Sequence, residues 1–215
     1  MNDLVSGIAS NLDSIVAGLF IGFAFGSVPF GYLLVRLKTG GDVRHSGSGN
    51  IGATNVGRAL GVSGGAVTLL LDAAKGAAGA FAADYFGAAV LGAAPAPAAA
   101  AGALGAVLGH CYTPWLGGRG GKGVATWLGA FGLIAPAATG ICAAVLVATL
   151  AASRMMSAAS LLGSMALPLV AWWLGEPAYT VAAASLAFLV IVWRHRANIR
   201  RIVRGQESRL GRAKA

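Results

Sequence analysis

The thirty residues VATWLGAFGLIAPAATGICAAVLVATLAAS, residues 124–153, contain no charged side chain and decide the fold class. A helix needs about 20 apolar residues to cross the hydrocarbon core of a membrane, so this stretch is too long for one span. Pro136 lies inside it, and proline interrupts a helix because it lacks an N–H donor. We therefore predict two spans that form a tight hairpin dividing near Pro136.

The composition of the whole chain agrees with an all-α integral membrane protein. Hydrophobic residues make up 57% of the 215 residues and charged residues 11%, whereas a soluble domain carries about 25% charged residues. The net charge of +9 would suggest nucleic acid in a soluble protein. No aromatic residues interleave with the basic ones, so we expect no nucleic acid partner. Cys111 and Cys142 show no metal-binding spacing, and we expect both to be reduced.

Seven apolar segments are candidate transmembrane helices, and we treat residues 1–215 as a single membrane domain. They are approximately residues 14–37, 64–85, 88–108, two halves of 124–153, 158–174 and 179–193. Pro95 and Pro97 would shorten or kink the third. No cleavable signal peptide is evident, because the first apolar segment continues past Phe30. The number falls to six if the division at Pro136 fails.

The distribution of charge predicts the orientation, because Lys and Arg accumulate in cytoplasmic loops. With the N-terminus outside and the C-terminus cytoplasmic, fifteen of the sixteen Lys and Arg residues fall in three inside loops and the tail. The remaining one, Lys75, lies within a helix. The outer segments hold only acidic charges, at Asp3, Asp13, Asp84 and Glu176. An even number of helices would break this pattern, which favours seven.

The first inside loop, GGDVRHSGSGNIGATNVGRALG at residues 40–61, has the composition of a phosphate site. Glycine lets the backbone approach an anion, and successive amides can form an anion-binding concavity. Arg58 can donate charge-assisted hydrogen bonds to phosphate. A flexible linker would not need Ser48, Asn50 and Asn55, so we predict that these residues bind a substrate phosphate.

The second inside loop, GHCYTPWLGGRGGKGVAT at residues 109–126, surrounds Arg119 and Lys122 with glycines. It is not a P-loop, because Gly123 rather than Ser or Thr follows the lysine. Together with the first loop it predicts that Arg119 and Lys122 bind phosphate. For His110, an interfacial position with a satisfied ring and a place in the site both stay open.

The third loop and the tail supply further candidates. Ser157, in SRMMSAAS at residues 153–160, could donate to phosphate or simply pack at a helix start. His195 and Asn198 are three residues apart and share a helix face. A histidine at the end of a span can act as a general base or as a donor to a phosphoryl oxygen. The neighbouring basic residues fit an anchor for anionic lipid head groups: Arg200, Arg201 and Arg204.

Asp72 and Lys75 are also three residues apart, within the second predicted span. Charges at membrane depth are costly and usually face the protein interior or water. We expect the two side chains to pair, in either a structural or a functional role.

Five segments together closely resemble the bacterial acyl-phosphate:glycerol-3-phosphate acyltransferase family, PlsY. They are GSVPFGYLL at 26–34, GSGNIGATNVGRALG at 47–61, LDAAKG at 71–76, GRGGKGVAT at 118–126 and RHRANIRRIVRGQE at 194–207. The resemblance implies seven spanning helices with an external N-terminus in the bacterial inner membrane. It implies acyl transfer from acyl phosphate to the 1-hydroxyl of sn-glycerol 3-phosphate, the first acylation of phospholipid synthesis, which gives lysophosphatidate and inorganic phosphate.

The resemblance also assigns roles. Site residues carry over onto Ser48, Arg58, Lys122, Ser157, His195 and Asn198. Arg119 stands where the family commonly has Lys, and the alignment around Ser157 is the weakest. We expect glycerol 3-phosphate, acyl phosphate and membrane lipids as partners, a monomer, and no cofactor or metal.

The chemistry of an acyl phosphate fits these residues. It is a mixed anhydride with a good leaving group, so direct attack needs neither a metal nor an enzyme nucleophile, and no nucleophile elbow is present. Either His195 or a substrate phosphate could take the proton.

Acyltransferases that use a histidine followed five positions later by aspartate are excluded. Here the fifth residue after each histidine is Asn50, Trp115 or Arg200. The alternative is a membrane transporter of anions or phosphate esters. A purely structural subunit would leave the glycine-rich loops unexplained.

Overall fold

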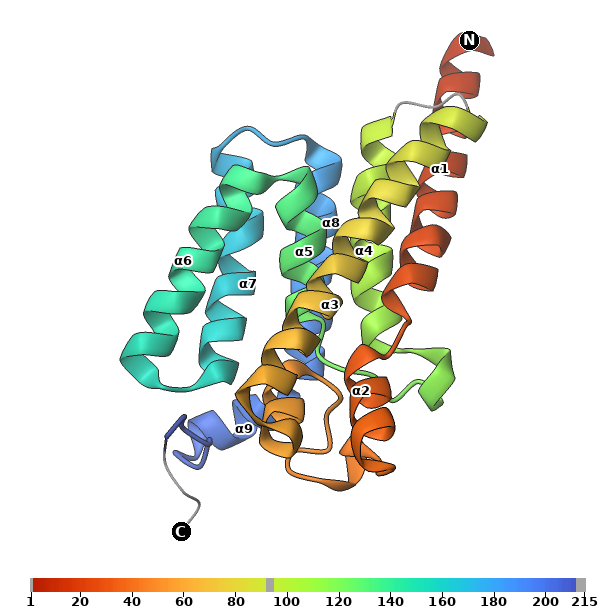
Figure 1. Ribbon diagram of the computed structural model, residues 1–215. Helices are drawn as coiled ribbons and strands as arrows, with labels where there is room; N and C mark the ends of the chain where they lie inside the picture. The colour runs from red at the N-terminus through yellow and green to blue at the C-terminus, as the bar shows by residue number, and fades with distance from the viewer. Residues whose placement is uncertain (1, 92–94, 212–215) are drawn as a thin grey trace. The chain divides into compact units, whose positions relative to one another are not determined.

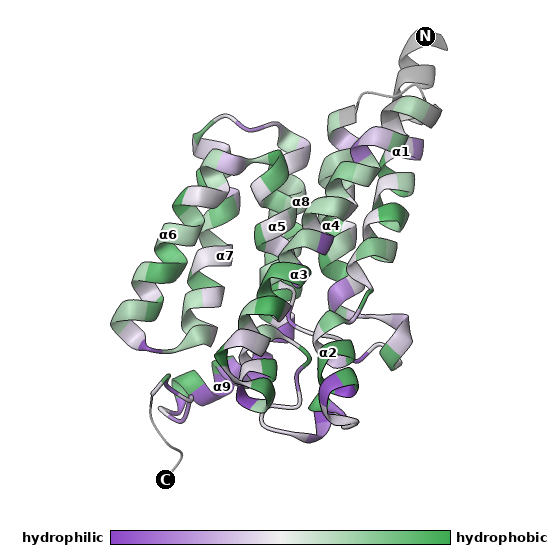
Figure 2. Ribbon diagram, in the orientation of Figure 1, coloured by the Kyte–Doolittle hydropathy of each residue, from purple (hydrophilic) through white to green (hydrophobic). Residues whose placement is uncertain are grey.

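The computed structural model describes residues 2–91 and 95–211, and the regular elements in these ranges are helices. The chain divides into two compact units, Met1–Ile134 and Ala135–Ala215. Figure 1 shows the helices, and Figure 2 shows that hydrophobic residues cover most of them while hydrophilic residues gather in α2 and α9. The predicted all-α class is confirmed for the described residues.

The first unit contains five α-helices and two short 3₁₀ helices in its described part. They are α1 (Asn2–Gly26), α2 (Phe30–Thr39), η1 (Val43–His45), α3 (Ala53–Leu91), α4 (Pro95–Cys111), η2 (Pro114–Leu116) and α5 (Val124–Ile134).

Helices α1 and α4 pack with their backbones in contact. A Cβ atom on Gly22 would overlap the carbonyl oxygen of Gly102, and one on Gly26 would overlap that of Ala106. Small residues allow this approach, which is the usual way for helices to pack inside a membrane. The alanines at positions 98–101 of α4 are buried.

The first predicted span contains a break. Helix α1 ends at Gly26 and α2 begins at Phe30, and the interruption coincides with Pro29. The Ser27 hydroxyl donates to the carbonyl oxygen of Ala24 at 2.8 Å, which ends α1 locally. Residues Leu12–Thr39 together are long and apolar enough to cross a membrane.

The second and third predicted spans need a correction. Residues 88–91, expected to begin the third span, continue α3 instead. Helix α4 begins at Pro95, where the missing N–H costs nothing because the first turn has no intrahelical acceptor for it. Pro95 therefore starts a helix rather than kinking one. Gly61, with φ of 79°, breaks the first part of α3.

The second unit contains α6 (Pro136–Ser153), α7 (Met156–Trp173), α8 (Ala178–Arg194) and α9 (Arg196–Val203). The predicted division near Pro136 is confirmed, because α5 ends at Ile134 and α6 begins at Pro136. Helices α8 and α9 meet at His195 with a bend of 64°.

The number of helices able to cross a membrane is smaller than the seven predicted. Among the described residues, four runs qualify by length and composition, and α8 with α9 would make a fifth. Helix α5 is apolar but only 11 residues long. The seven spans and the orientation are therefore not confirmed by these helices.

Candidate functional site

The two glycine-rich loops of the first unit share one hydrophobic cluster. Val43, Ile51 and Val56 of the first loop are buried against Val35 of α2 and Leu116 of η2. Leu116 belongs to the second loop, so its burial in this cluster brings the two loops together. The two predicted inside loops therefore lie side by side within this unit.

Asn55 organises the first loop from its interior. The side chain is 1% exposed, and its Nδ2 lies within hydrogen-bond distance of the carbonyl oxygens of Val43 (3.0 Å), Ser46 (3.0 Å) and Asn50 (2.9 Å). Its Oδ1 accepts from the Ser48 backbone N–H at 2.9 Å. An amide has two hydrogens to donate, and both are used here. Asn55 was predicted to bind phosphate directly, but these bonds give it a positioning role instead.

The polar tip of the loop is built around Ser48 and Asn50. Asn50 Oδ1 accepts from the Gly52 backbone N–H at 2.9 Å, which is the local turn that asparagine favours. Gly47 has φ of 57°, and a Cβ atom there would overlap Asn55 Oδ1. Glycine is therefore required at position 47 by both backbone conformation and space. Ser48 itself is exposed.

The two arginines of the first loop differ in whether a neighbouring side chain pairs with them. Arg44 pairs with Asp42 at 2.6 Å and lies 5.4 Å from the centre of the Tyr32 ring. The hydrogen bond from Arg44 lowers the pKa of Asp42 to about 2. Arg58 is exposed, and no hydrogen bond or ion pair engages its guanidinium among the residues that the structure describes. Its Cδ lies 3.6 Å from a Cβ built on Gly47, next to Ser48.

The second loop folds back onto the end of α4. Gly121 donates its backbone N–H to the carbonyl oxygen of His110 at 3.0 Å, and Gly120 donates to that of Cys111 at 3.2 Å. Lys122 follows directly and is half-buried, whereas Arg119 is exposed.

The second loop is also fixed to the α1–α2 break. The Thr113 hydroxyl donates to the carbonyl oxygen of Ser27 at 2.6 Å, and the Trp115 indole N–H donates to the Ser27 hydroxyl at 3.0 Å. One short segment between two helices therefore holds the loop that carries Arg119 and Lys122.

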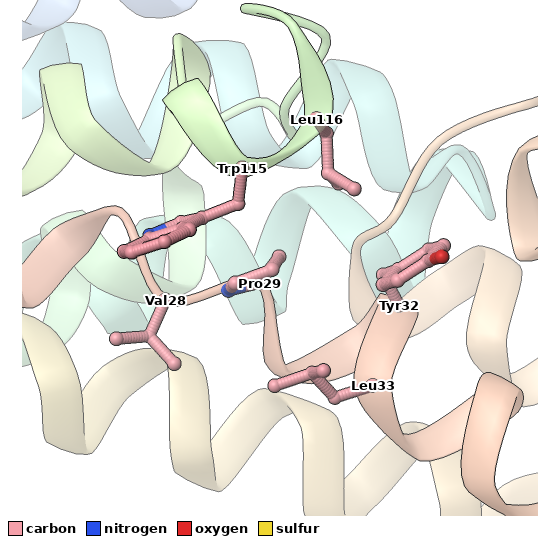
Figure 3. Close-up of a pocket in the computed structure, with 6 residues that line it drawn as sticks. All are labelled: Val28, Pro29, Tyr32, Leu33, Trp115 and Leu116. Atoms are coloured by element: carbon pink, nitrogen blue, oxygen red, sulfur yellow. The ribbon is translucent and has the colours of Figure 1, made fainter.

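An apolar groove lies beside this break (Figure 3). Its volume is about 320 Å³. Trp115 and Leu116 come from η2, and the other side chains come from the break and from α2 (Figure 3). The lining residues are Val28, Pro29, Tyr32, Leu33, Trp115 and Leu116.

Glu207 organises the candidate residues of the second unit. Its Oε1 accepts from the Ser157 hydroxyl at 2.9 Å and from Asn198 Nδ2 at 2.6 Å, and its Oε2 accepts from Arg201 Nε at 2.7 Å. Burial raises the pKa of Glu207, but hydrogen bonds from Arg201, Asn198 and Ser157 outweigh burial, so the pKa lies below its ordinary value. Ser157 and Asn198 are thus brought together by one carboxylate.

Sequence reasoning did not single out Glu207 as a site residue. The signal that could have found it is its charge, since it is the one acidic residue in the basic tail after α8. An isolated carboxylate among arginines is expected to pair with one of them.

His195 lies at the bend between α8 and α9. It is 2% exposed, and its Nδ1 is 2.8 Å from the carbonyl oxygen of Ile191. A carbonyl oxygen only accepts, so Nδ1 carries the proton. In the neutral ring, Nε2 is then the basic nitrogen.

Comparison with known proteins decides the family. The model of the family described as "Glycerol-3-phosphate acyltransferase" matches residues 16–205. The chain belongs to this family. Relatives named glycerol-3-phosphate acyltransferase include one from Rhodopseudomonas palustris (strain BisB5), 44% identical over 93% of this chain and 97% of the relative. Another, from Erythrobacter litoralis (strain HTCC2594), is 45% identical over 94% and 97%.

Two solved structures resemble the fold. A crystal structure of PlsY, an integral membrane glycerol 3-phosphate acyltransferase, in its glycerol 3-phosphate form is 34% identical with a TM-score of 0.80. It covers 94% of this chain and 96% of the solved chain. The lysophosphatidic acid form is 33% identical with a TM-score of 0.78 over the same shares. This member of the family is an integral, multi-pass membrane protein with bacterial relatives.

Proposed function

We propose that this chain transfers an acyl group from acyl phosphate to the 1-hydroxyl of sn-glycerol 3-phosphate. The products are lysophosphatidate and inorganic phosphate, and the reaction is the first acylation of phospholipid synthesis. The observation that carries this proposal is the family match over residues 16–205. Similar solved structures exist in a glycerol 3-phosphate form and a lysophosphatidic acid form.

The first unit supplies the phosphate-binding side chains. The Arg58 guanidinium and the Ser48 hydroxyl are both exposed, with no partner among the described residues. The Arg58 side chain passes beside Gly47, the residue before Ser48. Both are suited to charge-assisted or neutral hydrogen bonds to phosphate. Lys122 and Arg119 add positive charge from the adjoining second loop. Two loops of this kind suit a reaction in which both substrates carry phosphate.

Within the first loop, Asn50 and Asn55 serve the site in different ways. Asn50 stays a candidate for phosphate contact at the half-buried loop tip. Asn55 fixes the backbone N–H of Ser48 and the carbonyl groups around it, so its contribution is the shape of the loop. Loop shape matters because a displacement of about 1 Å in a catalytic group can cost about 100-fold in rate.

The second unit supplies the group that receives the proton. With Nδ1 held by the Ile191 carbonyl oxygen, His195 Nε2 is suited to accept a proton from the attacking hydroxyl. The phosphate of a substrate is the other candidate acceptor. Ser157 and Asn198, held by Glu207, would orient phosphoryl or hydroxyl oxygens. We propose that residues 1–215 act as one catalytic domain.

The reaction is a direct displacement. The hydroxyl oxygen of glycerol 3-phosphate attacks the acyl carbonyl carbon, a C–O bond forms, and the bond to the phosphate oxygen breaks. Phosphate leaves with the electron pair, and the hydroxyl proton passes to His195 Nε2 or to a phosphate oxygen. The cationic side chains of Arg58, Arg119 and Lys122 stabilise the negative charge that develops on the phosphoryl group.

The groove beside the α1–α2 break suits the acyl chain of the donor. Its lining is apolar, and one lining residue, Tyr32, stacks against Arg44 of the first loop. A hydrocarbon chain in this groove would gain burial free energy in proportion to the apolar area removed from water.

The finer topology is also a proposal. We propose seven spans in the bacterial inner membrane, with an external N-terminus, cytoplasmic active-site loops and a monomeric protein. The support is that every predicted span corresponds to a described helix, with α1 and α2 together forming the first. Fifteen of the sixteen Lys and Arg residues then lie on the cytoplasmic side.

The test is an assay of the purified protein with acyl phosphate and glycerol 3-phosphate. We expect lysophosphatidate to form without added metal and in the presence of a chelator, and no product when an acyl-CoA replaces the acyl phosphate. Folded protein in lipid membranes that makes no product, but moves phosphate esters across them, would favour the transporter.

A further inference from the structure

Three charged or titratable side chains are buried beneath the second loop, and the proposed reaction uses none of them. Asp72, Lys75 and His110 are 2%, 5% and 3% exposed. Lys75 Nζ lies 2.8 Å from Asp72 Oδ1, which confirms the predicted pairing, and His110 Nδ1 lies 3.5 Å from the same oxygen. Burying such a group costs folding free energy, which an apolar core would avoid. The cost calls for a role beyond packing.

Lys75 connects this buried trio to the α1–α2 break. Its Nζ donates to the carbonyl oxygen of Val28 at 2.7 Å and lies 5.7 Å from the centre of the Phe30 ring. Ser27, in the same break, accepts the hydrogen bonds of Thr113 and Trp115. The segment that Lys75 fixes therefore also holds the first part of the second loop.

His110 lies directly under the two residues that precede Lys122. A Cβ atom on Gly121 would overlap His110 Nε2 and lie 2.8 Å from Cδ2 and Cε1, and one on Gly120 would overlap the His110 carbonyl oxygen. Neither glycine has a positive φ. These glycines are required by the space against His110 rather than by their backbone conformation.

The chain after Lys122 is held against the same part of α3. A Cβ atom on Gly76 would overlap the carbonyl oxygen of Thr126, and one on Gly129 would overlap that of Ala73. Helices α3 and α5 therefore touch through their backbones on the far side of Lys122. The residues before Lys122 therefore rest on His110 of α4, and the helix after it rests on the segment of α3 that carries Asp72 and Lys75.

We propose that Asp72, Lys75 and His110 form a positioning network that sets where Lys122 presents its ammonium group to a substrate phosphate. The inference rests on the proposed function, because it takes Lys122 as a phosphate-binding residue. Asp72 pairs with Lys75 and lies beside the His110 ring, Lys75 holds the α1–α2 break, and His110 supports the Gly120–Gly121 backbone. None of the three touches substrate in this arrangement.

A purely structural trio would have different consequences. Damage to it would lower the melting temperature and the fraction of active protein, and would leave the KM of the folded fraction unchanged. A positioning network changes the KM of the substrate that Lys122 binds, because the ammonium group moves relative to the phosphate.

The test is a double-mutant cycle with Gly121→Ala and His110→Ala in the full chain, in lipid membranes. Lys122→Ala first identifies which substrate shows the raised KM. Gly121→Ala is expected to raise the same KM and to lower kcat/KM by about 100-fold, since a displacement of about 1 Å can have that effect. Adding His110→Ala removes the overlapping ring, and we expect it to restore at least about 10-fold of the loss.

Two further variants serve to interpret the double-mutant cycle. Gly140→Ala, at a helical glycine with nothing within 4 Å of an added Cβ, is expected to match the wild type. Asp72→Asn keeps the size of the side chain and removes its charge, and is expected to raise the same KM. A double variant no better than Gly121→Ala, or a normal KM in folded Asp72→Asn, would overturn the proposal.

The same cycle separates this inference from the proposed function. If the wild type makes no lysophosphatidate, the proposed function fails and the positioning role fails with it, and the melting temperatures of the four proteins then test only the contact between the His110 ring and the loop. Recovery of the Gly121→Ala loss by His110→Ala would still support the contact between ring and loop. Additive losses would overturn it.

Discussion

The first loop and the C-terminal tail are each organised by one buried polar side chain, but the two side chains differ in kind. Asn55 is neutral and bonds mostly to carbonyl groups of the loop backbone. Glu207 is a carboxylate and bonds to the side chains of Ser157, Asn198 and Arg201. The comparison shows that Asn55 fixes the path of a loop backbone, whereas Glu207 fixes the positions of candidate side chains directly.

The largest effect is expected at Glu207. Glu207→Ala removes the acceptor of three hydrogen bonds, and bonds to a charged group contribute about 1.5–3 kcal/mol each. We expect kcat/KM to fall by at least about 100-fold, measured as lysophosphatidate formation by folded protein. Glu176→Ala, the other glutamate of the chain, is the matched control and should retain activity. Normal turnover of Glu207→Ala would show that the Glu207 carboxylate is not needed to position Ser157 and Asn198.

Asn55→Ala is expected to have the next largest effect. It removes two amide hydrogens that are shared among three carbonyl oxygens, and the acceptor of the Ser48 N–H. Each neutral hydrogen bond contributes about 1 kcal/mol. Because the loop can partly rearrange and reach water, we expect a loss of about 10- to 100-fold in kcat/KM, with a raised KM for a phosphate substrate. Thr54→Ala, at the exposed preceding residue, serves as the control. An Asn55→Ala loss larger than that of Glu207→Ala would reverse the comparison.

The two arginines of the first loop sharpen the comparison further. Arg58 has no partner among the described residues, so Arg58→Ala is expected to raise the KM of a phosphate substrate by about 10-fold or more. Arg44 is paired with Asp42, and partly exposed pairs contribute little. Arg44→Ala should therefore change the same KM by less than about 3-fold. Equal effects of the two substitutions would contradict the assignment of phosphate binding to Arg58.

The smallest effect concerns pH, and it distinguishes the charged organiser from the neutral one. The folded-state pKa of Glu207 is lowered, so its contribution to stability is present above the ordinary pKa of glutamate and is lost as pH falls through the folded value. We expect the melting temperature of the wild type to fall as the pH drops below about 4.3. The melting temperature of Glu207→Gln should fall less over the same range. The melting temperature of Asn55→Ala should depend on pH in the same way as that of the wild type. If the melting temperatures of the wild type and Glu207→Gln fall equally with pH, the Glu207 carboxylate does not contribute to the pH dependence of stability.

Patterns local in sequence predicted much of the fold. Proline chemistry predicted the division at Pro136, and the spacing of Asp72 and Lys75 predicted their pairing. Glycine and polar content singled out the two loops to which we assign phosphate binding. These features depend on residues within a few positions of one another, where periodicity and spacing carry the information.

The remaining features depend on contacts between distant segments. The role of Glu207 requires α7 and the tail to meet, and the overlap of Gly121 with His110 requires the loop to fold back onto α4. The extension of α3 to Leu91 was missed because Pro95 was interpreted as a kink within the third span, whereas it begins the next helix. Asn55 was assigned to phosphate because its burial is not visible in composition.

The proposal that the topology tests most directly is that the loops of Ser48 and Lys122 and the tail that follows His195 all emerge on the cytoplasmic side of the membrane. Single cysteines at the exposed positions Ser48, Arg119 and Arg204 can be labelled with a membrane-impermeant maleimide, because the native cysteines are buried. In oriented vesicles we predict labelling of all three from the cytoplasmic face alone. Labelling of Ser48→Cys and Arg204→Cys from opposite faces would contradict the account.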